Sequence, residues 1–384
     1  MARRFCMPPN VYIGTDCFNE AISYLCTLGS HALIVTGRSM QQQGHLRTLT
    51  LVLESRQIAY TIFSGITGEP TDTMIAKGAD CYKNSHCDFI IGFGGGSPLD
   101  SAKAIGVLVA SGGRISDYCG TEITTPIPPL VAIPSTAGTG SEVTQFTIIT
   151  DTVNDVKMLL KGPALVPDVA IVDPTFSMQM PHEVAVSTGL DALTHAIEAY
   201  TSRKAFDLSD MYALSAIQRI FRYMPAAISE NDAKEARIQM ALAAFEAGVS
   251  FSNSSVTLVH GMSRPIGALF HVPHGLSNAM LLEVCMSFAA DGATDRFAAL
   301  GRAIGMADAP AEDTYACQKF IEALRALCLT CHVPSLSEYG VNREQFLSQV
   351  EKMATDAIAS GSPGNTRKPI SKNDICRIYR SLMD

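Results

Sequence analysis

The chain has no tryptophan, few charged residues (17%) and no long uninterrupted apolar run. A membrane-spanning helix needs roughly 20 consecutive apolar residues, so we expect none here. The formal net charge is -8 and no basic segment with interleaved aromatic residues is present, which argues against nucleic acid and anionic membranes as partners. Pro8 and Pro9 follow the first arginines directly and interrupt any apolar signal-peptide core, so we expect a cytoplasmic protein.

A disulfide framework is also missing. The eleven cysteines are scattered and odd in number, which fits reduced thiols in the cytosol. Cys328, Cys331 and His332 match the C-x-x-C-H pattern of c-type haem attachment, so a haem electron carrier is one alternative function. Because the pattern ends an amphipathic helical run and no export signal precedes it, we interpret these thiols as packed at a helix end.

The 384 residues, 47% of them hydrophobic, are enough for two domains with well-buried cores. In the first half, short runs rich in Val and Ile alternate with helical patterns, which is typical of βαβ units and a parallel sheet. These strand-like runs cover residues 31–37, 59–66, 88–96, 129–136 and 169–174. Beyond Pro181 long helical patterns dominate. We therefore predict an α/β domain over residues 1–180 and an all-helical domain over residues 181–384.

A glycine-rich turn follows the strand-like run in DFIIGFGGGSPLDSAK, residues 88–103. Gly94, Gly95 and Gly96 allow close approach of a ligand, Ser97 can cap the next helix, and Asp100 lies in its first turn. The exposed N–H groups and the helix dipole favour an anion such as a pyrophosphate. The match to G-x-G-x-x-G lacks its third glycine, so a plain strand-to-helix turn is the alternative interpretation.

A second glycine-rich loop, PSTAGTGSE over residues 134–142, follows the next strand-like run. It carries the hydroxyl side chains of Ser135, Thr136 and Thr139 among glycines, which suits hydrogen bonds to ribose and phosphate. One such loop is commonly only a turn. Two of them at the carboxyl ends of strands in one sheet indicate a nucleotide site.

Asp191 and His195 are four residues apart in the helical stretch DALTHAIEAY and so share one face of a helix. His260, His271 and His274 follow in one later stretch. A carboxylate with three imidazoles is a donor set for Fe²⁺ or Zn²⁺ that leaves a position open for a substrate oxygen. A solvated polar pair is the alternative for Asp191 and His195, and the spacing does not tell which later histidine is the spectator.

Four motifs together give the sequence a strong resemblance to the iron-containing (group III) alcohol dehydrogenase family over nearly its whole length. They are GGGSPLDSAK (94–103), PSTAGTGSE (134–142), GLDALTHAIEAY (189–200) and HGMSRPIGALFHVPHG (260–275). The resemblance implies a dinucleotide-binding α/β domain, a helical metal-binding and substrate domain, and an active site in the cleft between them.

Position by position, the resemblance places the family's metal ligands on Asp191, His195, His260 and His274. Its pyrophosphate loop falls on Gly94 to Ser97. The remaining cofactor and pocket positions fall on Thr136 and Thr139, on Lys157, and on Phe251, which the resemblance places at the nicotinamide side of the pocket.

The sequence departs from the family pattern at two places. Many members carry a histidine that relays protons four residues after the third ligand, but Arg264 stands there and stays protonated at neutral pH. Arg264 could instead hold an anionic or strongly polar group of the substrate or pair with the cofactor, and His271 is the alternative proton relay. At the end of the first strand-like run, where NAD-preferring relatives place Asp, this sequence has Gly37, Arg38 and Ser39. Without the acidic group, Arg38 could bind the 2′-phosphate of NADP, so we expect NADP(H) to be accepted or preferred over NAD(H).

The resemblance implies metal-dependent hydride transfer between NAD(P)(H) and a small alcohol, diol or aldehyde. The expected ion is Fe²⁺, with Zn²⁺ as the alternative. A homodimer or higher homo-oligomer is expected. Glycerol dehydrogenases and dehydroquinate synthases share the architecture and a related metal site, so they are the alternative functions at this stage.

Overall fold

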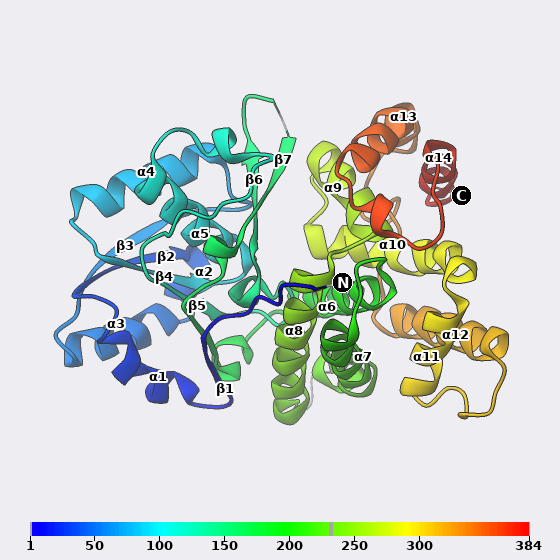
Figure 1. Ribbon diagram of the computed structural model, residues 1–384, viewed down its shortest axis with the longest axis horizontal. Coiled ribbons are helices and arrows are strands. Elements are labelled where there is room, and N and C mark those ends of the chain that lie inside the picture. The colour runs from blue at the N-terminus through cyan, green and yellow to red at the C-terminus, as the bar shows by residue number, and fades with distance from the viewer. Residues whose placement is uncertain (1, 155, 230–232, 384) are drawn as a thin grey trace. The chain divides into compact units, whose positions relative to one another are not determined.

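The computed structural model describes residues 2–154, 156–229 and 233–383. The chain divides into two compact units, Met1–Pro181 and His182–Asp384. Their internal architectures differ, as Figure 1 shows by strands in the blue-to-green part and helices in the green-to-red part. The expectation of a parallel-sheet region followed by a helical region is confirmed.

The first unit is built on a parallel sheet of six strands in the order β1-β8-β5-β4-β2-β3. In chain order the strands are β1 (Asn10–Ile13), β2 (His31–Gly37), β3 (Ala59–Ile66), β4 (Phe89–Gly94), β5 (Leu130–Pro134) and β8 (Val169–Val172). Every residue of β4, β5 and β8 is buried. Strands that are covered on both faces need continuous apolar runs, which is why these segments are so rich in Val and Ile.

Helices cover both faces of this sheet (Figure 1). They are α1 (Cys17–Leu25), α2 (Arg38–Gln42), α3 (His45–Ser55), α4 (Asp72–Asn84) and α5 (Gly96–Ser111). Neighbouring residues of one strand point to opposite cores: Ile90 packs in the cluster with α4 and α5, and Ile91 packs in the cluster with α1 and α3. The alternation follows from the two-residue period of a strand.

An antiparallel hairpin of β6 (Phe146–Asp151) and β7 (Val156–Lys161) lies outside the main sheet. The sequence analysis did not predict it. Their residues alternate between half-buried and buried, with exposed residues only at the ends of β7, and this weak pattern is less visible in the sequence than the apolar run of a central strand.

The second unit is a helical assembly, and its helices correspond to the long periodic segments expected beyond Pro181. They are α6 (His182–Thr201), α7 (Asp207–Ala227), α8 (Lys234–Ser254), α9 (Leu258–Phe270), α10 (His274–Ala289), α11 (Thr294–Ala303), α12 (Asp313–Thr330), α13 (Arg343–Ala359) and α14 (Lys372–Ser381). Among the described residues, no helix is both long and apolar enough to cross a membrane.

The C-x-x-C-H stretch lies at the carboxyl end of α12. Cys331 is only 2% exposed, and burial raises the pKa of Cys328 to about 12 and that of Cys331 to about 11. Thioether bonds to haem need two reachable thiols, so the haem alternative fits this geometry poorly. All eleven cysteines are free thiols.

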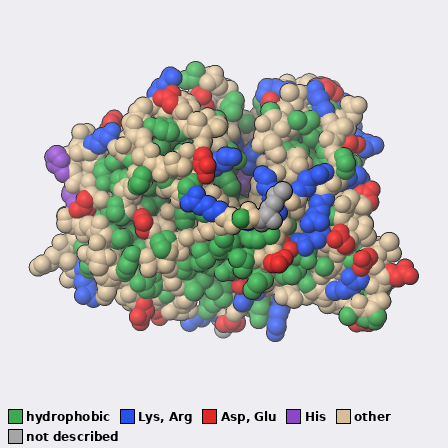
Figure 2. All heavy atoms as spheres, viewed as in Figure 1, with side chains coloured by type: hydrophobic (Ala, Val, Ile, Leu, Met, Phe, Trp, Pro, Cys, Tyr) green, Lys and Arg blue, Asp and Glu red, His purple; other side chains and the backbone are tan. Residues whose placement is uncertain are grey.

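On the face shown in Figure 2, lysine and arginine side chains lie among aspartate and glutamate side chains.

Candidate active site

Two adjacent helices and the start of a third bring four potential metal ligands together in the second unit. Asp191 and His195 lie one turn apart on α6, His260 lies on α9, and His274 is the first residue of α10. The Oδ1 atom of Asp191 lies 3.5 Å from His260 Nε2, 3.9 Å from His274 Nε2 and 4.0 Å from His195 Nδ1. Asp191, His195 and His260 are buried and offer donor atoms that all lie within 4.8 Å of one another.

Gly275 allows the start of α10 to approach α6. A Cβ atom at this position would lie 2.6 Å from the carbonyl oxygen of Ser187 and 3.4 Å from Cβ of Asp191. Any larger residue would therefore push α10 away from α6. Because His274 precedes Gly275 directly, this close backbone contact sets the distance between its imidazole and the Asp191 carboxylate.

A stack of rings fixes the histidine orientations. The ring of Phe251, on α8, stacks on that of His195 with centroids 4.0 Å apart and an interplanar angle of 12°. His195 in turn stacks on His260 at 4.4 Å and 25°. The sequence analysis placed Phe251 beside a nicotinamide; in the structure its ring face contacts His195.

Glu198 fixes the tautomer of His260. Its fully buried carboxylate accepts hydrogen bonds from Thr257 Oγ1 (2.8 Å), from the backbone N–H of Val259 (2.6 Å) and from His260 Nδ1 (2.5 Å). With the proton on Nδ1, the lone pair of Nε2 is directed at the Asp191 side. Carboxylates that hold a ligating imidazole in this way orient the ring and increase its basicity.

Asn278, one turn into α10, lies among the same groups. Its Nδ2 atom is 2.6 Å from Asp191 Oδ1, 3.1 Å from His260 Nε2 and 3.2 Å from His274 Nε2. Its Oδ1 atom is buried and has no hydrogen-bond partner among the described residues. Asn278 thus leaves a spare acceptor oxygen beside the donor set.

The charges of the group are strongly coupled. Burial by itself would raise the pKa of Asp191, but the imidazoles of His195, His274 and His260 hold that pKa far below its usual value. Burial would lower the pKa of His260, but Glu198 and Asp191 raise it. The carboxylate of Asp191 is therefore ionised in the presence of the imidazoles, as a metal ligand must be.

These observations fit a divalent transition-metal ion. One carboxylate oxygen and imidazole nitrogens form the mixed donor set that Fe²⁺ and Zn²⁺ accept. Metal–ligand bonds of about 2.0–2.2 Å require donor atoms roughly 3–4 Å apart, which is the spacing around Asp191 Oδ1. His274 is the most accessible of the four, with 28% of its side chain exposed. His271 is exposed at the end of α9 and stands apart from the contacts described above.

Arg264 follows His260 by one turn of α9. Its Nη1 donates to Ser362 Oγ at 3.1 Å, while its Nε is buried without a hydrogen-bond partner among the described residues. Ser362 is brought there by a tight contact between the loop after α13 and α9: a Cβ atom on Gly261 would lie 2.6 Å from the ring of Pro363. Burial lowers the pKa of Arg264.

In the first unit, the two glycine-rich loops meet at the carboxyl edge of the sheet. From β2 the chain moves to β3 at one edge of the sheet, and from β4 it moves to β5 toward the other edge. The direction of strand addition therefore reverses between β2 and β4, and ligands of such sheets bind at this topological switch point. The loops after β4 and β5 pack closely: a Cβ atom on Gly96 would lie 2.7 Å from Thr139 Cγ2, and one on Gly95 3.4 Å from Thr136 Cγ2. Gly94 has a φ of 146°, which favours glycine.

Asp100 makes two hydrogen bonds within the first unit. Its Oδ1 accepts a hydrogen bond from Ser141 Oγ at 2.6 Å and its Oδ2 one from the backbone N–H of Ile148 at 2.9 Å. These hydrogen bonds join α5 to the second loop and to β6, and the cofactor-binding role of Asp100 stays a prediction.

Lys103 and Glu142 extend this buried network. Lys103 Nζ donates to two carbonyl oxygens and the hydroxyl of the segment Thr144–Phe146. Burial lowers the pKa of Lys103 to about 8 and raises that of Glu142 to about 7. The second loop is therefore anchored by polar groups that have no contact with solvent.

The remaining cofactor candidates differ in their freedom to bind. Lys157, on β7, is already paired with Glu69, whose carboxylate oxygens lie 2.7 and 2.8 Å from its Nζ. Arg38 and Ser39, which open α2 directly after Gly37, are exposed. Ser97 is half-buried in the first turn of α5, and Ser135 is buried at the start of the second loop. Lys157 is therefore engaged, whereas Arg38 and Ser39 are exposed to a ligand at this edge.

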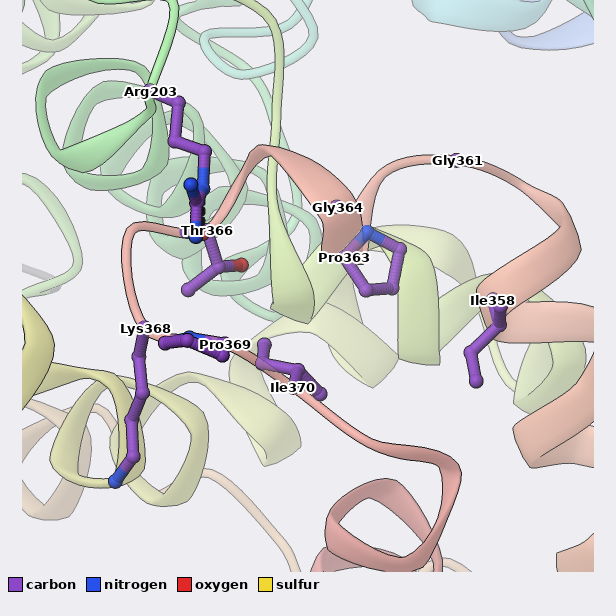
Figure 3. A pocket seen from close by; sticks show the side chains of 9 residues that line it. All are labelled: Arg203, Ile358, Gly361, Pro363, Gly364, Thr366, Lys368, Pro369 and Ile370. Atoms are coloured by element: carbon purple, nitrogen blue, oxygen red, sulfur yellow. Dashed lines mark hydrogen bonds between the residues drawn. The ribbon is translucent and has the colours of Figure 1, made fainter.

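A surface pocket of about 200 Å³ lies in the second unit, next to the loop after α13 (Figure 3). Its lining includes Arg203 and Lys368, and Figure 3 shows Arg203 bonded to the backbone at Thr366. Both cations are engaged, because Lys368 binds the carbonyl oxygen of Phe288. None of the site residues expected from the sequence lines this pocket.

We call Asp191, His195, His260 and His274, together with the side chains that bind them, the metal group. Several of the supporting residues were missed by the sequence analysis. Glu198 carried a usable signal, since it lies seven residues after Asp191 and three after His195 on the same helix face. Asn278 carried one too, four residues after His274. Ser362 carried none, because its approach to Arg264 depends on tertiary packing of a distant loop.

Comparison with known proteins gives one consistent result. The model of iron-containing alcohol dehydrogenase matches residues 8–174, and that of the Fe-containing alcohol dehydrogenase family, C-terminal, matches residues 185–383. The chain is 34% identical to the NAD-dependent methanol dehydrogenase of Bacillus methanolicus, over 99% of both chains. It is 32% identical to the NADPH-dependent butanol dehydrogenase of Clostridium saccharobutylicum, over 99% of this chain and 97% of the relative.

The structure is similar to a solved 1,3-propanediol oxidoreductase. The TM-score is 0.95 at 31% sequence identity, and the likeness covers 100% of both chains. The similarity therefore extends over both compact units.

Proposed function

We propose a reaction for this chain from the premise that it belongs to the iron-containing alcohol dehydrogenase family. It is an oxidoreductase that acts on alcohols and their carbonyl counterparts. The proposed reaction is hydride transfer between NAD(P)(H) and a small alcohol, diol or aldehyde. The observation that carries the proposal is the buried Asp191 carboxylate with the imidazoles of His195, His260 and His274 gathered around it.

These four side chains would hold the ion, Fe²⁺ in the first place and Zn²⁺ as the alternative. When bound, such an ion supplies Lewis acidity toward a hydroxyl or carbonyl oxygen. The chain's own groups provide the orientation. Glu198 keeps the proton of His260 on Nδ1, and the Phe251 ring keeps His195 in its stacked position.

The cofactor is assigned to the edge of the sheet where the two glycine-rich loops meet. Gly94 to Gly96 leave room for a pyrophosphate at the start of α5, where free N–H groups and the helix dipole favour an anion. Thr136 and Thr139 offer hydroxyl groups next to it, and Ser97 and Ser135 lie in the same two loops. Asp100 supports the loops from behind, as its hydrogen bonds to Ser141 and Ile148 indicate.

Arg38 supports the use of NADP(H). It is exposed at the end of β2, and no acidic residue stands at Gly37, Arg38 or Ser39 to repel a 2′-phosphate. The relatives include an enzyme named for NAD and one named for NADPH, so membership of the family does not determine which cofactor is preferred. We expect NADPH to be at least as good a substrate as NADH, and a comparison of kcat/KM for both cofactors tests this.

A cytoplasmic location and a homodimer belong to the same proposal. Eleven free thiols suit a reducing compartment. The strand β1 forms one edge of the sheet, and its Ile13 is 40% exposed, so a second copy could pair with it. Light scattering after size-exclusion chromatography should give twice the chain mass, and Ile13→Lys should shift the population toward monomer.

A substrate panel tests the proposed reaction directly. The purified protein, loaded anaerobically with Fe²⁺, is assayed with short alcohols, 1,2- and 1,3-diols, glycerol and the corresponding aldehydes while NAD(P)H absorbance is followed. We expect turnover with one or more members of the panel and at least a thousandfold loss in Asp191→Asn. Turnover that Asp191→Asn leaves unchanged would overturn the assignment of the metal group.

A further inference from the structure

Arg264 is a half-buried cation with a buried Nε atom, and it lacks a carboxylate counterion among the described residues. Its Nη1 bonds to the neutral hydroxyl of Ser362, its Nε is buried without a partner, and no carboxylate lies within ion-pair distance of it among the described residues. Burial of an uncompensated charge is unfavourable. A guanidinium kept in such a place is explained if an anion from outside the chain completes its surroundings.

Two other half-buried arginines of this unit have carboxylate partners, whereas the Nε atom of Arg367 is buried without a hydrogen-bond partner among the described residues, as that of Arg264 is. Arg219 lies 3.1 Å from Glu246, and Arg296 lies 2.6 Å from Asp210. The carboxylate nearest to Arg264 in electrostatic influence is Glu198, whose oxygens already accept three hydrogen bonds. Glu198 therefore serves His260 and leaves the Arg264 guanidinium free.

The charge balance of the metal group also favours an anionic ligand. Asp191 and Glu198 contribute two negative charges and Arg264 one positive charge, which leaves the group at minus one with neutral imidazoles. A divalent ion bound by the ligands changes this sum to plus one. A substrate with a negative group of its own would then neutralise the site.

Two donors lie on neighbouring side chains, since Arg264 and Ser362 are in hydrogen-bond contact. One is the Nε–H of Arg264, and the other is the hydroxyl of Ser362, which accepts from Arg264 and keeps its own proton to donate. Ser362 is only 4% exposed and is held in place by its backbone N–H bond to Ser360 Oγ. Arginine and a hydroxyl are typical partners of carboxylate and sulfonate oxygens.

We propose that Arg264 and Ser362 bind the anionic end of the substrate, a short aldehyde that carries a carboxylate or a sulfonate. The proposal rests on the proposed function. The aldehyde oxygen lies toward His260, one helical turn or about 5.4 Å along α9, which limits the separation of the two ends to a few carbons. The carbonyl carbon takes a hydride from NAD(P)H and its oxygen takes a proton, giving the hydroxy anion and NAD(P)⁺, while the anionic group is unchanged.

The first test compares matched substrates. Succinate semialdehyde is paired with pentanal, and 2-oxoethanesulfonate with butanal, and kcat/KM is measured for the Fe²⁺-loaded full-length enzyme. We expect at least a tenfold preference for one anionic member over its neutral partner. Arg264→Gln should reduce that ratio 10- to 100-fold, mainly through KM, and Arg264→Lys should restore part of it. Arg325→Gln, which breaks a surface ion pair with Glu283, is the control and should keep the ratio.

The second test does not depend on turnover. Binding of ethanesulfonate and of butanoate to the metal-loaded protein is measured by calorimetry, with the metal content of each variant determined in parallel. We expect binding of one of the two anions to weaken at least tenfold in Arg264→Gln and to recover partly in Arg264→Lys. Equal binding by wild type and Arg264→Gln, or a wild-type preference for the neutral aldehydes, would overturn the proposal. Absence of NAD(P)H turnover with every substrate would instead refute the proposed function, while calorimetry still decides the role of Arg264.

Discussion

The metal group on α6, α9 and α10 and the glycine-loop edge of the sheet are built in opposite ways. In the metal group, buried hydrogen bonds join His260 to Glu198 and Asn278 to Asp191. At the sheet edge, the proposed cofactor surface is backbone, and Gly95 and Gly96 let the two loops pack closely there. A metal ion needs specific donor atoms, whereas a pyrophosphate needs N–H groups and space.

This difference predicts which property a substitution should reduce in each region and which property it should leave unchanged. Changes in the metal group should remove metal and turnover together, since few atoms carry the function. Changes at the sheet edge should weaken cofactor binding and leave the metal content as it was. The four predictions below separate these outcomes, beginning with the largest effect.

Gly275→Val tests whether backbone packing also governs the metal group. The added side chain would collide with the carbonyl oxygen of Ser187 and displace His274 from Asp191. We expect at least a thousandfold loss of kcat/KM together with loss of bound iron, measured by elemental analysis. Gly68→Ala, at a position with open space around it, is the matched control and should behave like wild type. Full metal content in Gly275→Val would show that His274 is not needed for binding.

Glu198→Gln tests the support of the His260 tautomer. The neutral amide still fills the space but binds the Nδ1 proton more weakly, so the imidazole is a poorer donor. Loss of such a supporting carboxylate typically costs 10- to 100-fold in metal affinity. We expect a reduction in that range in a competition assay with a chelator. An unchanged affinity would mean that the 2.5 Å contact with His260 is only structural.

Gly96→Ala tests the backbone-built site. The new methyl group would meet Thr139 Cγ2 at 2.7 Å and force the two loops apart. We expect the Kd for NAD(P)H to rise about tenfold, an effect of roughly 1.4 kcal/mol, with metal content unchanged. The double variant Gly96→Ala/Thr139→Ser, which removes the opposing methyl group, should regain most of the affinity. Failure of this rescue would contradict the steric explanation.

Glu142→Gln tests the buried network behind the second loop. The folded-state pKa of Glu142 is about 7 against an ordinary value of 4.5, so the folded protein holds a proton there that the unfolded chain releases. The stability from this group is present below pH 4.5 and is lost as the pH rises through 7. We expect wild type to lose about 2 kcal/mol more than Glu142→Gln between pH 5 and 7. The free energy of unfolding is measured with urea at both pH values. An equal loss of this free energy in wild type and Glu142→Gln would contradict the prediction.

The sequence predicted the fold and the Asp191–His195 pair because both depend on local patterns, whereas His260 and His274 were assigned by the family resemblance. Buried parallel strands appear as runs of Val and Ile, and Asp191 and His195 share a helix face by their spacing. The hairpin β6–β7 was missed because its strands alternate weakly. The contact of Ser362 with Arg264 was missed because residues 98 positions apart meet only in the folded chain.

Side-chain roles at the sheet edge were harder to predict than those at the metal group. Asp100 was expected to face a cofactor, yet its carboxylate is taken by Ser141 and Ile148. Lys157 was expected there too, and its ammonium group is paired with Glu69. A helix position or a motif shows that a polar residue is near a site, whereas its hydrogen-bond partners depend on loops whose conformation no periodic pattern encodes.

Metal content and turnover of His260→Ala, measured on the same preparation, test the central claim most directly. His260 is the ligand whose donor atom lies nearest to Asp191 and whose tautomer is fixed by Glu198. The account predicts about one iron or zinc ion per wild-type chain, and loss of both the ion and NAD(P)H-dependent turnover in the variant. A variant that keeps the wild-type metal content and rate would contradict it.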